Sequence, residues 1–132
     1  MLGSVLHDVN DEAAVLDIYR YEIIDWDDPM VDPDPESNNL LHCQRAEHLG
    51  AQAELIVYEA LYEGPWAEVS FEVQTAEYAV VGLALSDIWL LLFKDSRKRG
   101  DWLRPVSGWP AEVAEIRSWE QATGMTWKGK RR

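Results

Sequence analysis

Residues 77–93 read EYAVVGLALSDIWLLLF, an almost continuously apolar stretch. It divides into two strand-length runs, 77–85 and 87–93, which meet at Ser86 and Asp87. Short apolar runs rich in β-branched and aromatic residues, separated by turn-forming residues, are typical of paired strands. Strands without polar alternation are usually covered on both faces. The stretch therefore predicts a largely buried antiparallel hairpin.

Further strands are expected on both sides of this hairpin. Residues 68–74 alternate, with Val69, Phe71 and Val73 apolar and their neighbours polar, which predicts a strand with one buried face and an outward Glu68. Residues 19–26 contain β-prone tyrosine and isoleucine and predict a first strand. Residues 101–109 predict a last one.

Helices are expected before and after this group of strands. One runs from about residue 38 to 48 and is followed by Gly50, a residue suited to a left-handed helix end. A second covers about 51–62 and is stopped by Gly64 and a proline. A final helix is expected to begin at Pro110 and to end at Gly124. A short helical stretch is also predicted after Asn10.

This order of elements predicts an α+β fold. We expect an antiparallel sheet of about four to five strands, with two helices after the first strand, a C-terminal helix, and all helices on one face. A length of 132 residues suits a single domain. Within it we distinguish an N-terminal extension (1–18), a core (19–124) and a basic tail (125–132).

Charge is divided unevenly along the chain. Residues 1–93 hold 19 Asp and Glu against two Arg, whereas residues 94–132 hold ten Lys and Arg against five acids. The formal net charge is −12. Most of the molecule should therefore repel polyanions, and RNA is expected to approach only through the basic C-terminal third.

Several classes of protein are disfavoured by composition. No apolar run has the length of a membrane helix, no signal peptide is evident, and Cys43 has no second cysteine to pair with, so we expect a cytoplasmic protein without membrane contact. Residues 25–36 hold many aspartates and three prolines. They lack the spacing of a calcium loop, and we predict a solvated acidic loop, no metal site and no cofactor.

Pieces of the chain, taken in order, resemble a known family. They are the strand and loop at 21–27, Asn39 followed by His42, the His48-Leu49-Gly50 triplet, an acid-rich helix, the hairpin, and residues 104–107 leading into a helix. This order is similar to the BrnT-type toxins of bacterial type II toxin–antitoxin pairs, small ribonucleases of the RelE/ParE-like fold. The resemblance covers roughly residues 19–122. Leu49 separates a His and a Gly that the family has adjacent, and Trp109 stands where the family carries a second arginine.

The resemblance implies a ribonuclease site on the last strand and a cognate antitoxin as partner. Arg104 would hold the phosphate, and His42 or His48 could move protons, although both histidines also suit a helix-packing role. The basic turn would attract RNA through Lys94, Arg97, Lys98 and Arg99. Trp102 and Trp109 could stack on bases or anchor a protein interface.

A second reading is a non-catalytic interaction module. An acidic, tryptophan-rich protein of the immunity or inhibitor type would bind a basic partner through residues 25–36 and the helix at 51–62. The sequence leaves both readings open.

Overall fold

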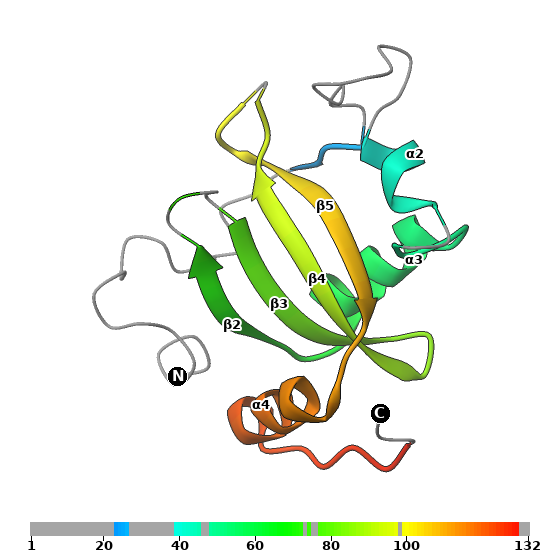
Figure 1. Cartoon of the computed structure of the whole chain (residues 1–132), viewed down its shortest axis with the longest axis vertical. Helices are drawn as coiled ribbons and strands as arrows, with labels where there is room; N and C mark the ends of the chain where they lie inside the picture. The colour runs from blue at the N-terminus through cyan, green and yellow to red at the C-terminus, as the bar shows by residue number, and fades with distance from the viewer. Residues whose placement is uncertain are drawn as a thin grey trace.

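The computed structural model describes residues 23–26, 39–45, 48–72, 74, 77–97 and 99–129. The fold is α+β, as predicted, and is built on a five-stranded sheet in the order β1-β5-β4-β3-β2 (Figure 1). The strands are β1 (Ile23–Ile24), β2 (Trp66–Glu72), β3 (Glu77–Ala84), β4 (Asp87–Asp95) and β5 (Trp102–Pro110). The helices are α2 (Asn39–Cys43), α3 (Ala53–Tyr58), its π-helical continuation η3 (Glu59–Glu63), and α4 (Val113–Thr123). The predicted N-terminal helix and most of the acidic loop lie outside the described residues.

The predicted hairpin is present and forms the middle of the sheet. β3 and β4 pair in antiparallel register from Tyr78 opposite Phe93 to Ala84 opposite Asp87. The two turn residues, Leu85 and Ser86, both have positive φ, as a tight two-residue hairpin turn requires. Neither is a glycine, so the turn carries backbone strain.

The sheet is mixed, whereas an antiparallel one was expected. β1 pairs in parallel with β5, with Ile23 opposite Trp102 and Ile24 opposite Leu103. The Asp25 amide continues the pairing by donating to the Leu103 carbonyl at 2.8 Å. The two partners lie far apart in sequence, and a pattern of side chains carries no information about the direction of such a distant neighbour.

Helices cover both faces of the sheet, so the expectation that all would pack on one face is wrong. Val80 and Leu91 belong to a buried cluster with residues of α3, whereas their neighbours Val81 and Leu90 pack with α4. Successive residues of a strand point to opposite faces, so α3 and α4 lie on opposite sides. The reason is that β3 and β4 are apolar on both faces and each face needs a cover.

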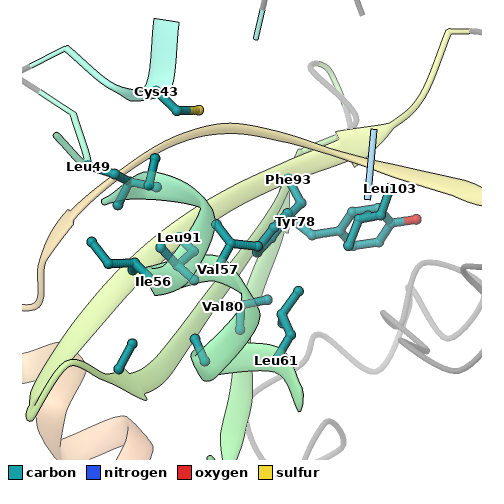
Figure 2. Packing of buried hydrophobic residues seen from close by; sticks show 13 residues of the cluster. Cys43, Leu49, Ile56, Val57, Leu61, Tyr78, Val80, Leu91, Phe93 and Leu103 are labelled. Carbon is teal, nitrogen blue, oxygen red and sulfur yellow. The ribbon is translucent and has the colours of Figure 1, made fainter. Parts of the chain in front are cut away.

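The larger cluster joins the helical segment to the sheet (Figure 2). Ile56 and Val57 of α3 are buried against β3 and β4. Gly82 lets the helical segment approach closely, because a Cβ at this position would lie 2.9 Å from the Ala60 Cβ. On the other face, Trp119 of α4 is buried and its indole N–H donates to the Pro65 carbonyl at 3.0 Å.

Three local predictions need correction. Glu68 is fully buried rather than outward, because it lies opposite Val80 on the α3 side while Val69 packs on the α4 side, and both faces of the sheet are covered. Pro110 is the last residue of β5 rather than the first of a helix, and α4 begins after Glu112. The helix predicted at 38–48 is shorter in the structure, where it ends at Cys43. Gly124 does end α4 with a left-handed φ of 74°, as predicted.

Candidate functional site at the edge of β5

The outer edge of β5 is occupied by a helix where β1 ends. Beyond Leu103, no strand among the described residues pairs with β5 on this side, and α2 lies alongside it (Figure 1). The fully buried Asn39 side chain donates to the Asp25 carbonyl at 2.5 Å and to the Pro105 carbonyl at 3.2 Å. The Asn39 amide thus bonds one carbonyl just after β1 and one carbonyl of β5, and it fixes α2 against β5.

Two histidines and a serine meet at this edge. The rings of His42, in the last turn of α2, and His48, in the following loop, lie 4.2 Å apart between centroids and are inclined by 38°. His48 Nδ1 and Ser107 Oγ are 2.5 Å apart in a hydrogen bond. The structure therefore brings together His42, His48 and one residue of β5, Ser107, that sequence reasoning did not single out as functional.

The contact between the histidines depends on where α2 stops. An uninterrupted helix would place residues six apart on different faces. Instead α2 ends at Cys43, whose carbonyl accepts hydrogen bonds from the amides of Leu49 and Gly50 at 2.9 and 3.1 Å. Gly50 adopts a φ of 81°, which glycine tolerates and which turns the chain back. The loop thereby places His48 beside His42.

Ser107 faces the loop because β5 is bulged. Leu92 is opposite Ser107 and Phe93 is opposite Pro105, so Val106 is left without a cross-strand partner. A bulge of this kind bends the strand and redirects the side chain beside it. Ser107 is buried at this position. No simple pattern in the sequence identifies such a bulge.

Gly108 seats the loop on the strand. A Cβ on Gly108 would lie 2.6 Å from Leu49 Cδ2 and 2.9 Å from both the Leu90 carbonyl oxygen and Leu91 Cδ2. Leu49 is buried in the main core and immediately follows His48. The site is consequently held by core packing as well as by hydrogen bonds.

Cys43 plays no part as a reactive thiol. It is fully buried, and burial raises the pKa of its thiol to about 12. A thiol so far from ionisation is a weak nucleophile at neutral pH. Cys43 is instead a small side chain of the main core.

Arg104 and Lys94 stand opposite each other on neighbouring strands. Leu103 belongs to the core on the α3 side, so alternation places Arg104 on the face of the sheet away from α3. Arg104 is half-buried and lies three residues before Ser107, a separation of roughly 10 Å along a strand. Arg104 and Ser107, the residue that contacts His48, thus lie on one strand but at different positions along it.

The basic turn is partly neutralised. Arg99 forms a two-point ion pair with Asp101, with Nε–Oδ1 at 2.9 Å and Nη2–Oδ2 at 2.6 Å. Its guanidinium also lies 5.4 Å from the centroid of the Trp102 ring, so the indole already has a cation on its face. Arg97 is exposed. Lys98 lies outside the described residues.

Trp109 sits far along β5 from Trp102. It is 38% exposed and pairs with Leu90 at the end of the sheet nearest α4. The two tryptophans are therefore separate features rather than one stacking platform.

The described part of the chain offers neither a metal-binding cluster nor a helix that could span a membrane. It contains no group of three or more His, Cys, Asp or Glu side chains placed to hold a metal ion. None of its helices has the length and apolar character needed to cross a membrane.

No protein-family model, curated protein or solved structure matches the chain. Any assignment of function accordingly rests on the residues and their geometry.

Proposed function

We propose that the protein is a small endoribonuclease of the BrnT/RelE type, with its site at the outer edge of β5. The observation that carries the proposal is the contact of His42 with His48 and the 2.5 Å hydrogen bond between His48 Nδ1 and Ser107 Oγ. Two imidazoles on a firmly packed edge, with Arg104 roughly 10 Å from Ser107 along β5, provide the groups that RNA cleavage requires. The order of elements, one strand, two helices, four strands and a helix, is the one on which the resemblance rests.

The reaction is a transfer within the RNA backbone. The 2′-oxygen of a ribose attacks the adjacent phosphorus, its proton passes to a neutral imidazole, and the bond from phosphorus to the 5′-oxygen breaks. The departing 5′-oxygen takes a proton from a protonated imidazole. Histidine suits both roles because its ordinary pKa lies near neutrality. The cleavage leaves a cyclic phosphate and a free 5′-hydroxyl.

Arg104 would bind the phosphate or a neighbouring one. A guanidinium offers paired donors that match phosphate oxygens, and Lys94 opposite it adds a second positive charge. Arg97 would assist the approach of RNA to this end of the sheet, in the C-terminal third that holds ten of the twelve Lys and Arg residues. In this proposal the protein would act in the cytoplasm, where a cognate antitoxin would cover this surface.

Incubation of the purified protein with a mixed RNA pool at low salt and neutral pH tests the proposal. His42→Ala and His48→Ala should each lower the cleavage rate about 100-fold or more. Arg104→Ala should lower it while Arg117→Ala, which removes an exposed arginine of α4, leaves it unchanged. Ser107→Ala should also lower the cleavage rate, whereas Ser118→Ala, its matched control on α4, should leave the rate unchanged. Wild-type protein that leaves the RNA intact, or histidine variants that cleave like the wild type, would refute the assignment.

A non-catalytic interaction module remains the second candidate. The observation favouring it is the helical segment 53–63, which carries three glutamates, no basic residue, and exposed apolar side chains. Salt-sensitive binding to a basic protein, without RNA cleavage, is the result expected of such a module. The acidic residues 27–36 that were expected to share this role lie outside the described residues.

A further inference from the structure

A hydrophobic groove runs beside α3, on a part of the molecule separate from the edge of β5 where the histidines meet. It has a volume of about 530 Å³ and lies between β1 and the helical segment. Its lining includes Ile24, Trp26, Glu54, Leu55, Tyr58 and Tyr62. Apolar surface of this kind is unusual on the outside of a small domain and marks a site of contact.

The helical side of the groove presents a regular apolar stripe. Leu55, Tyr58 and Tyr62 follow one another at helical spacing and are 44%, 51% and 46% exposed. The two tyrosine rings lie 5.5 Å apart between centroids and form one continuous surface. Burial, followed by the nearby Tyr58, raises the pKa of Tyr62, so the Tyr62 ring is neutral at physiological pH. Tyrosine combines a large apolar contact area with a hydroxyl that remains hydrated, which suits a reversible interface.

Acidic charge surrounds the stripe. Glu54 and Glu63 are exposed at the two ends of the segment, and Glu59 lies between them. From Ile23 to Phe93 the sequence contains a single basic residue, Arg45. A partner that brings positive charge would be attracted to this region, and an acidic one would be repelled.

We propose that this groove binds a basic amphipathic helix of a partner protein. Leucine or isoleucine side chains of that helix, repeated at helical spacing, would pack on Leu55, Tyr58 and Tyr62. Flanking lysines or arginines would lie near Glu54 and Glu63. Helix-in-groove recognition uses this combination of an apolar stripe and a charged border. The inference does not depend on ribonuclease activity, because the groove lining does not include His42, His48, Arg104 or Ser107.

The test measures binding of a synthetic probe to the full-length protein. The probe is a labelled peptide of leucine and lysine about 18 residues long, with leucines at helical spacing so that it can form an amphipathic helix. Fluorescence anisotropy should show saturable binding of this peptide. A peptide with the same leucines and glutamate in place of lysine should not bind.

A matched pair of variants locates the site. Leu55→Asp adds a carboxylate to the stripe, and Leu41→Asp adds the same charge to an equally exposed leucine of α2, 50% exposed. Leu55→Asp should weaken binding of the lysine peptide about tenfold or more, and Leu41→Asp should change it by less than about twofold. Tyr58→Ala, which adds no charge, should also weaken binding.

Several outcomes would overturn the inference. Equal effects of Leu55→Asp and Leu41→Asp would mean that the peptide responds only to overall charge. Equal binding of both peptides would remove the charge argument, and absence of binding would remove the groove itself. Conversion of a dimer to a monomer by Leu55→Asp would assign the groove to a second copy of the chain. Circular dichroism of each variant establishes that it is folded. Every part of the test measures peptide binding, so its result is independent of RNA cleavage.

Discussion

Gly108→Ala tests the link between core packing and the histidine site. The new Cβ would lie 2.6 Å from Leu49 Cδ2 and 2.9 Å from the Leu90 carbonyl oxygen, distances at which something must move. The side chain of Leu49 is buried and the carbonyl belongs to the β4 backbone, so neither can simply turn into solvent. We expect Leu49 to be displaced, and the adjacent His48 with it.

The expected cost follows from overpacking a filled core. Such insertions reduce the free energy of unfolding by about 1–3 kcal/mol. For a chain of this size the midpoint of thermal unfolding should fall by about 4–12 °C. Gly100→Ala is the matched control, because a Cβ there meets nothing within 4 Å. Both changes remove the same flexibility from the unfolded chain, so the difference between them isolates the packing cost.

Urea unfolding followed by tryptophan fluorescence measures the two free energies. The His48 imidazole resonances should also move in Gly108→Ala and stay in place in Gly100→Ala. Adding Leu49→Ala to Gly108→Ala removes one of the close contacts, and the two changes should be non-additive by about 0.5 kcal/mol or more. Free energies for Gly108→Ala and Gly100→Ala that agree within about 0.5 kcal/mol would show that the packing argument is wrong.

Three further changes test other parts of the structure. Cys43 should resist a thiol reagent at neutral pH until the protein unfolds. Because burial raises the pKa of its thiol from 9.0 to about 12, the contribution of the protonated thiol to the unfolding free energy is complete below pH 9.0 and is lost as pH rises toward 12. The fall of the unfolding free energy over this pH range should be shallower in Cys43→Ala. Asn39→Ala leaves the Asp25 and Pro105 carbonyls without the amide and should lower the unfolding free energy by about 2–4 kcal/mol, whereas a change below about 0.5 kcal/mol would contradict the anchoring role. Ser86→Gly relieves a positive φ of 59° and should raise the unfolding free energy by about 0.5–1 kcal/mol in urea titrations, and a loss of stability would argue against the strained turn.

The helical segment stabilises the strained turn of the hairpin through one hydrogen bond. The Leu85 amide donates to Glu59 Oε1 at 2.9 Å, so a residue of η3 holds the turn between β3 and β4. This contact partly offsets the cost of positive φ at two residues that are not glycine. It joins elements 26 positions apart in the chain.

The sequence by itself determined the hairpin, the order of the described elements and several of their ends. Residues 77–93 can form only short apolar strands with a turn between them, and the structure confirms that assignment. Gly124 ends α4 as expected, since glycine adopts a left-handed conformation at little cost. These features depend on local chemistry, which a linear pattern records.

The tertiary structure decided the parallel pairing of β1, the separation of α3 and α4 onto opposite faces, and the site itself. His42 and His48 meet because α2 stops at Cys43 and the amides of Leu49 and Gly50 bond back to the Cys43 carbonyl. Ser107 reaches them because Val106 is bulged out of its pairing with β4. Each of these depends on contacts between residues distant in sequence. Such contacts are selected by the packing of the whole core, which no single segment specifies.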